Sequence, residues 1–113
     1  MYTVTGTTIT MTRGDSVRID LRIKNADGTD YTPDANDKIR FTVKKDYGGE
    51  NLIHKFIRPD DLALYIEPED TENLPYGYYV YDVELTDTDG IVDTIIRKAR
   101  LNISEEVTQW KQL

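Results

Sequence analysis

Apolar and polar residues alternate with a period of two along much of this chain. Between residues 17 and 24 every second residue is apolar, and each residue between them is charged. Successive side chains of a β-strand point to opposite faces, whereas this spacing would scatter charge around every side of a helix. The segment therefore predicts a strand with one buried face and one face in water. Its apolar residues are Val17, Ile19, Leu21 and Ile23.

The same alternation recurs in other segments and predicts a chain made mostly of strands. Residues 52–57 predict a short strand at the edge of a sheet, because His54 and Lys55 interrupt its apolar faces. The remaining segments with a period of two are residues 7–12, 39–44, 62–67 and 79–86.

Residues 91–103 also predict a strand, but their register is ambiguous. The last apolar positions, which end at Ile103, share one face, whereas residues 91–92 and 95–96 supply apolar side chains to both faces. A bulge near Arg97 would bring the pattern into line, and so would partial burial of the second face. The bulge is the interpretation that we prefer.

Turn-forming residues separate these segments. Residues 25–28 and 87–90 each place Asp-Gly between two predicted strands, which indicates a hairpin because glycine adopts positive φ. Gly14-Asp15 and Gly48-Gly49 mark two further turns. Residues 68–74 predict a short helical turn, since proline is favoured at its start and acidic side chains suit its N-terminus.

About seven short strands, separated by turns every ~8–12 residues, predict an all-β fold: an antiparallel sandwich or barrel with almost no helix. We expect one domain over residues 1–103 and a C-terminal tail over residues 104–113, where the alternation is lost. Val107 and Trp110 lie three positions apart in this tail, which fits a short helix or a docking segment.

Composition and charge narrow the classes of function. The 113 residues include 14 Lys or Arg and 21 Asp or Glu, so the net charge is -7. Such a surface repels phosphate backbones and anionic lipids, so we expect neither nucleic acid nor a membrane as partner. Cysteine is absent and His54 is the only histidine, which leaves few routes to catalysis or metal binding. We expect no enzymatic activity and no cofactor.

The N-terminal stretch does not predict export. Residues 1–12 have neither a basic flank nor an apolar run, so we expect no signal peptide. No segment contains the ~18 continuous apolar residues that a membrane span requires. We therefore expect synthesis in the cytoplasm.

Two features that could suggest binding sites are interpreted as turns. Residues 13–15 spell Arg-Gly-Asp, a tripeptide that integrins bind, but its Gly-Asp falls where the chain turns between strands. Four aspartates could bind calcium where two turns meet, yet their spacing lacks the alternate ligands of an EF-hand, and solvated turn residues are the preferred interpretation. These aspartates are Asp27, Asp30, Asp87 and Asp89.

Four of the eight tyrosines lie in residues 76–81. Tyr79 and Tyr81 fall on the predicted inner face, and Tyr79 is expected to bond the backbone of the preceding crossover, as in a tyrosine corner. Tyr76 and Tyr78 are then left exposed. They could form an aromatic platform for sugars or a contact for a partner protein.

A longer motif connects these residues to a known family. Residues 74–85 read LPYGYYVYDVEL and resemble the LP-x-G-x-Y-x-Y-D-V-E-L signature of small immunoglobulin-like domains from phage and prophage structural proteins. Residues 12–16, 39–45 and 68–71 resemble the opening, the third strand and the short helix of the same domains. The resemblance covers about residues 7–103 and includes the N-terminal domains of baseplate upper proteins.

The resemblance implies an immunoglobulin-like β-sandwich that belongs to the virion, after synthesis in the bacterial host cytoplasm. Its expected place in the particle is the baseplate or tail, with the neck and the head left open. The resemblance also implies a non-catalytic module that binds other phage structural proteins. The aromatic tail and the short edge strand add the expectation of a homo-oligomer. We expect the contacts first at Trp110 and Val107, although Trp110 could equally cap the core of its own domain, and second at Tyr76 and Tyr78. The alternative is a carbohydrate- or cell-surface-binding module that uses Tyr76, Tyr78 and Tyr47.

Overall fold

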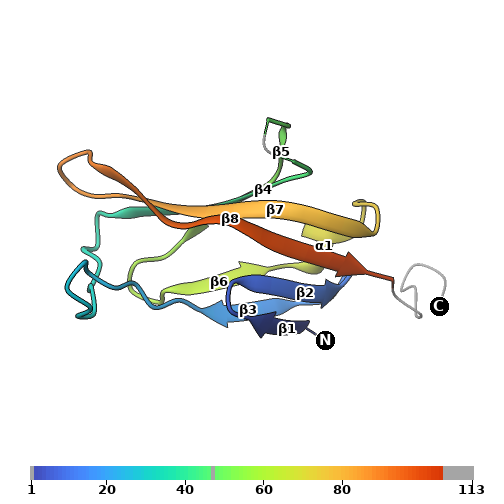
Figure 1. The fold of residues 1–113 in the computed structure, drawn as a ribbon, viewed down its shortest axis with the longest axis horizontal. Coiled ribbons are helices and arrows are strands. Elements are labelled where there is room, and N and C mark those ends of the chain that lie inside the picture. Colours follow the sequence, from blue (N-terminus) through green and yellow to red (C-terminus); the bar gives the residue numbers. More distant parts are fainter. Residues whose placement is uncertain (1, 47, 106–113) are drawn as a thin grey trace.

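The computed structural model has two facing layers of β-strands and one short helix (Figure 1). It describes residues 2–46 and 48–105, apart from the side chains of residues 2–5. The elements in chain order are β1 (Tyr2–Thr5), β2 (Thr8–Thr12), β3 (Val17–Asp20), β4 (Lys38–Lys44), β5 (Asn51–Ile57), β6 (Ala63–Ile66), α1 (Pro68–Thr71), β7 (Gly77–Thr86) and β8 (Val92–Ser104).

These strands form two sheets. Six of them form one sheet in the order β1-β2-β8-β7-β4-β5, and β3 pairs with β6 in the other. Strands β2 and β8 run parallel, so the larger sheet is mixed and the expectation of a purely antiparallel fold is wrong. The reason is the turn after β2, which sends the chain to β3 in the other sheet, so that this edge of β2 pairs with β8 and not with β3.

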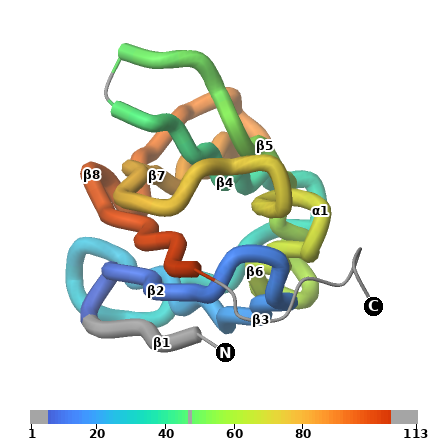
Figure 2. Tube along the Cα trace, turned by 90° about the vertical axis from the view of Figure 1, so that its right-hand side faces the viewer, coloured from blue at the N-terminus to red at the C-terminus, as the bar shows by residue number. Residues whose placement is uncertain are grey.

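The larger sheet bends over along the pairing of β2 with β8. In both views β2 lies at the level of β3 and β6, while β4, β7 and β8 form the opposite layer (Figures 1 and 2). Figure 1 shows β1 in the same layer as β2. The inward side chains of the two layers pack into one apolar core, which the alternation had predicted. Its most deeply buried members include Ile9, Met11, Ile39, Phe41, Val43, Leu64, Ile66, Tyr79, Val83 and Leu101.

Most of the predicted strands are confirmed, and their ends differ. The strand predicted for residues 17–24 ends at Asp20, because its partner β6 begins only at Ala63 and the preceding Leu62 turns with φ 49°. Ile23 is nevertheless buried, so the apolar pattern continues beyond the ladder. The structure also contains β1, which the alternation did not predict, and eight strands in all among the described residues.

The turns and the helix follow the prediction with two corrections. The helix α1 ends at Thr71 rather than Leu74, and Glu72 closes it by donating its N–H to the carbonyl of Pro68 at 3.2 Å. Residues 25–28 form a tight turn but connect only an isolated bridge, not two strands of a sheet. Residues 87–90 join β7 to β8 as predicted.

The bulge predicted near Arg97 is confirmed. In β8 two residues, Arg97 and Lys98, lie opposite the single residue Asp82 of β7. Lys98 has φ 55°, in the left-handed region that side chains disfavour. The shift returns Ala99 and Ile103 to the buried face. A second register shift lies between Val83 and Glu84, which pair with Ile96 and Thr94. The two shifts together reconcile the two halves of the apolar pattern.

The C-terminal tail was expected to hold the main contact residues. Residues 106–113, with Val107 and Trp110, lie outside the described residues, and so does Tyr47. Within the described ranges, no helix combines the length and apolar character needed to cross a membrane.

Candidate functional site

A tyrosine corner fixes the chain where it crosses from α1 to β7. Tyr79 is 1% exposed, and its hydroxyl donates a hydrogen bond to the carbonyl of Pro75 at 2.5 Å. Tyr81 donates to the carbonyl of Thr7, and its ring centroid lies 5.3 Å from that of Phe41. Burial raises the pKa of both phenols, that of Tyr81 to about 12. The predicted inner positions of the two tyrosines are confirmed.

Tyr76 lies just before this corner, and its ring is held by Arg13, the residue that follows β2. Its side chain is 40% exposed, and the Cζ atom of Arg13 lies 4.2 Å from its ring centroid. The guanidinium of Arg13 donates to the Tyr76 hydroxyl at 2.9 Å and to the carbonyl of Leu74 at 3.2 Å. Arg13 therefore ties the crossover to β2 and restricts the exposed ring.

The Arg-Gly-Asp tripeptide is a tight turn, as predicted. Gly14 has φ 83°, and its N–H donates to the hydroxyl of Thr71 at 2.9 Å. The N–H of Asp15 donates to the carbonyl of Thr12 at 3.1 Å. Half-buried and bonded to α1, the segment lacks the extended exposure that an integrin ligand needs.

Tyr78 lies on the outer face of the larger sheet. It is 64% exposed, and the Cζ atom of Arg100 lies 5.1 Å from its ring centroid. The ammonium of Lys45 donates to the carbonyl of Tyr78 at 3.1 Å and lies 4.6 Å from the ring centroid of Tyr79. The predicted exposure of Tyr76 and Tyr78 is confirmed.

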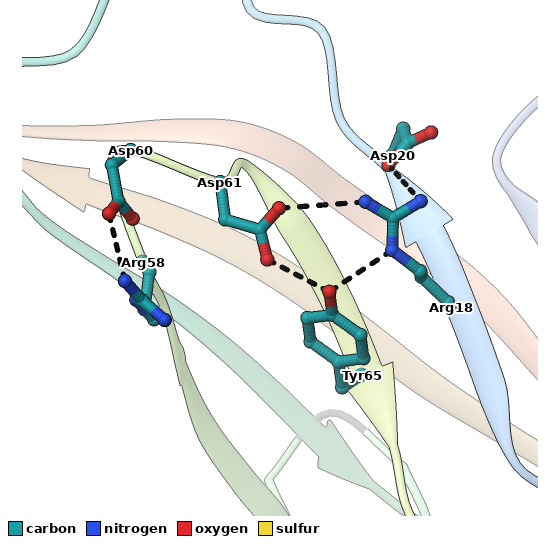
Figure 3. Close-up of polar contacts among 6 residues, drawn as sticks. All are labelled: Arg18, Asp20, Arg58, Asp60, Asp61 and Tyr65. Atoms are coloured by element: carbon teal, nitrogen blue, oxygen red, sulfur yellow. Dashed lines mark hydrogen bonds and ion pairs between the residues drawn. The ribbon is translucent and has the colours of Figure 1, made fainter.

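A third exposed tyrosine, which the sequence did not single out, lies on the smaller sheet (Figure 3). Tyr65 of β6 faces Arg18 of β3, whose Nε donates to its hydroxyl at 3.0 Å. That hydroxyl donates to Asp61 at 2.9 Å, and the guanidinium also pairs with Asp20 at 3.1 Å. The hydrogen bond with Tyr65 and then the charge of Asp20 raise the pKa of Arg18.

The signal for this third group was present but incomplete. The alternation places Arg18 and Tyr65 on the wet faces of two predicted strands. It does not state that these strands pair, because strand pairing depends on long-range contacts that a period of two does not encode.

Tyr65, Tyr76 and Tyr78 are thus each in contact with an arginine. Cation–π pairs occur about once per 70–80 residues in proteins, whereas the described residues contain four. A ring that is already restricted loses little conformational entropy on binding, and tyrosine and arginine are enriched among the residues that dominate interfaces. We call Tyr65, Tyr76 and Tyr78 with their arginines the Tyr–Arg groups. Their aromatic and cationic side chains are preorganised for contact with a partner molecule.

The turn aspartates act within their own turns. Asp87 accepts hydrogen bonds from two backbone N–H groups at 2.9 and 3.0 Å. Two hydrogen bonds from Thr29, that of its hydroxyl first, lower the pKa of Asp27. Asp30 forms an ion pair with Lys24. Across residues 2–46 and 48–105, no three acidic or histidine side chains gather closely enough to hold a metal ion.

His54 is an exposed residue on the edge strand β5, as predicted. Its Nδ1 atom lies 3.2 Å from the hydroxyl oxygen of Thr42. Its ring meets that of Phe56 edge to face, with the centroids 5.4 Å apart. Phe56 is 66% exposed, so the edge of the sheet carries an aromatic pair in water.

No protein-family model matches this sequence, and no curated protein matches it either. The function therefore has to be inferred from the fold and from the surfaces described above.

Proposed function

We propose that this chain is a non-catalytic, immunoglobulin-like module that binds other protein subunits of a phage or prophage particle. The observation that carries the proposal is the set of Tyr–Arg groups at Tyr65, Tyr76 and Tyr78, each exposed by 40% or more and each held by an arginine. Tyrosine and arginine provide large contact area and directed hydrogen bonds at low entropic cost.

Strand pairing supports the immunoglobulin-like part of the proposal. In an immunoglobulin sandwich, strands B and E pair in one sheet, and strands C, F and G lie side by side in the other. Here β3 pairs with β6, and β4, β7 and β8 are neighbours, with β5 in the place of an added C′ strand. The hydroxyl of Tyr79 bonds back to Pro75 near the start of the F-like strand, where a tyrosine corner belongs.

The motif in residues 74–85 supports the particle setting. Its resemblance to phage and prophage structural domains includes Pro75 and Tyr79, the two residues that form the corner. A module of 113 residues offers a small contact area, so useful affinity would come from repetition in a symmetric assembly such as a baseplate or tail. Its location would be the virion, after synthesis in the host cytoplasm.

The alternative is a carbohydrate- or cell-surface-binding module that uses the same rings. A sugar stacks on an open ring face, and Tyr78 at 64% exposure is the ring best placed for it. Against this, a guanidinium approaches the rings of both Tyr76 and Tyr78 and occupies part of that surface. Saturable binding on a glycan array that is lost with Tyr78→Ala would favour the alternative.

The test of the proposal is the affinity for partner subunits. The chain would be co-expressed with the proteins encoded by neighbouring reading frames, and each pair would be measured by calorimetry. The double variant Tyr76→Ala with Tyr78→Ala should bind a partner at least tenfold more weakly, because truncating an interface anchor typically costs about 2 kcal/mol or more of binding free energy.

Ile91→Ala is the matched control, because Ile91 is an apolar residue that is 57% exposed and lies outside the Tyr–Arg groups of the described part of the chain. A partner that binds the Tyr65→Ala, Tyr76→Ala and Tyr78→Ala variants as tightly as the unaltered chain would contradict the proposed surface.

A further inference from the structure

The outer face of the larger sheet is hollowed where the bulge of β8 faces β7. The depression has a volume of about 350 Å³ and lies between β4, β7 and β8. Alternation places Thr42, Lys44, Val80 and Asp82 on the face opposite the core, whereas the side chain of Tyr81 belongs to the core. The polar side chains that line it are Thr42, Lys44, Asp82, Thr94, Arg97 and Lys98.

Three cations line this depression without forming an ion pair within the described part of the chain. Lys44, Arg97 and Lys98 form no hydrogen bond, ion pair or ring contact with any described residue. Elsewhere basic side chains are mostly engaged, as Arg40 is with Glu84 at 3.7 Å. The chain carries a net charge of -7, so a local excess of unpaired cations is a departure from its average surface.

The bulge creates this arrangement at a conformational cost. It places two consecutive cations of β8, Arg97 and Lys98, opposite the single residue Asp82. Lys98 takes φ 55°, although an L-residue other than glycine disfavours it, and both cations are exposed rather than packed. Bulges that re-aim side chains and backbones held in disfavoured conformations are both concentrated at functional sites.

Among the described residues, Asp82 is the one acidic side chain that lines the depression. It is half-buried and accepts no hydrogen bond from a described residue. Burial, and then the charge of Glu84, raise the pKa of Asp82 even though Lys44 and Arg40 act in the opposite direction. No ion pair joins Asp82 to Lys44, Arg97 or Lys98. The three cations against one carboxylate give the described lining of the depression a net positive charge.

We propose that the depression binds an acidic segment of a partner protein, whose carboxylates lie among Lys44, Arg97 and Lys98. The inference rests on the proposed protein-binding function and adds the chemistry of the partner. Carboxylates accept charge-assisted hydrogen bonds from ammonium and guanidinium groups, and the hydroxyls of Thr42 and Thr94 supply further donors. A long polyanion such as nucleic acid is disfavoured, because beyond the depression it would meet a surface with net negative charge.

The probe is an acetylated, amidated hexaglutamate peptide, titrated into the ¹⁵N-labelled full chain at low salt. We expect saturable shifts of the amides of residues 42–44, 80–82 and 94–98, and weaker binding as salt is raised. Hexaglutamine should cause none of these shifts. Asp82→Asn should tighten the binding of hexaglutamate, because it removes the negative charge that the described residues contribute to the lining.

The variant Arg97→Ser with Lys98→Asn should weaken hexaglutamate binding at least tenfold, with asparagine chosen because it tolerates positive φ. The matched control is Arg22→Ser with Lys38→Asn, which makes the same charge change at two cations that have no hydrogen bond or ion pair among the described residues and do not line the depression. The control should change the affinity by less than twofold, and the amide spectra of both variants check that they are folded.

Equal weakening by the two variants, shifts that miss the depression, or inorganic phosphate binding as tightly as hexaglutamate would each overturn the inference. The proposed function fails separately, through the affinity of partners for the tyrosine variants. The two proposals can fail independently. If a partner no longer binds the Tyr76→Ala, Tyr78→Ala variant but hexaglutamate does not shift the amide signals of the depression, the proposed function stands and only the acidic-segment inference is rejected.

Discussion

At the scale of single residues, neighbouring tyrosines take opposite roles. Tyr79 and Tyr81 are buried and bond to backbone carbonyls, whereas Tyr76 and Tyr78 are exposed against arginines. Strand alternation decides this division, because adjacent side chains of β7 point to opposite faces. The same rule made these positions predictable from the sequence.

The corner hydroxyl should stabilise the fold. Tyr79→Phe removes the hydrogen bond to the carbonyl of Pro75 and leaves that acceptor without its partner. We expect the free energy of unfolding to fall by about 1–3 kcal/mol in denaturant titrations. Tyr78→Phe is the control, since its hydroxyl bonds to no described residue, and an equal loss in both variants would contradict the corner.

Tyr31 should make the stability depend on alkaline pH. Its hydroxyl donates to Asp37 at 2.6 Å, and this bond, followed by burial, raises its pKa from 10.0 to about 12. A raised pKa means that the folded chain holds the proton more tightly, so this stabilisation is complete below pH 10 and is lost as the pH rises through about 12. The difference in unfolding free energy between the unaltered chain and Tyr31→Phe should shrink across that window. A difference that stays constant there would contradict the assignment.

At the scale of elements, the existence of strands was predictable and their partners were not. The sequence features that predicted β4, β7 and the bulge of β8 are local ones. They are the alternation, the turn glycines and the break in the apolar pattern near Arg97. The parallel pairing of β2 with β8 and the contact of Arg18 with Tyr65 depend on which strands meet across the fold. Those pairings are set by packing of the whole chain. For this reason the third Tyr–Arg group was not predicted from the sequence.

The bulge should tolerate glycine where a regular strand does not. Lys98→Gly relieves a side chain at φ 55°, and we expect the free energy of unfolding to stay level or rise by up to about 1 kcal/mol. Lys38→Gly, at an exposed position of the regular strand β4, should lower it by about 0.5–1 kcal/mol. Thermal or urea unfolding measures both. A loss at Lys98 equal to that at Lys38 would contradict a strained bulge.

At the scale of the whole molecule, two layers share one core, and the surface chemistry differs between places on it. The outer face of the larger sheet carries Tyr78 and the cationic depression, whereas the turns carry many of the acidic side chains. Such segregation of charge favours oriented association with a partner over unspecific contact.

The tail should reveal whether it serves assembly or the core. We expect light scattering at micromolar concentration to show a homo-oligomer, and deletion of residues 105–113 to reduce it to a monomer with little change in melting temperature. A tail in which Trp110 caps the core of its own domain would instead lower the melting temperature on deletion and leave the mass per particle unchanged.

The central claim is that the exposed tyrosines held by arginines are the surface that meets a partner subunit. Hydroxyl-radical footprinting with mass spectrometry reports the solvent exposure of each tyrosine in the free chain and in the complex. We expect reduced modification of Tyr76 and Tyr78 when a partner is bound, with buried Tyr79 and Tyr81 unchanged as internal controls. A stable complex in which Tyr65, Tyr76 and Tyr78 all remain as reactive as in the free chain would contradict it.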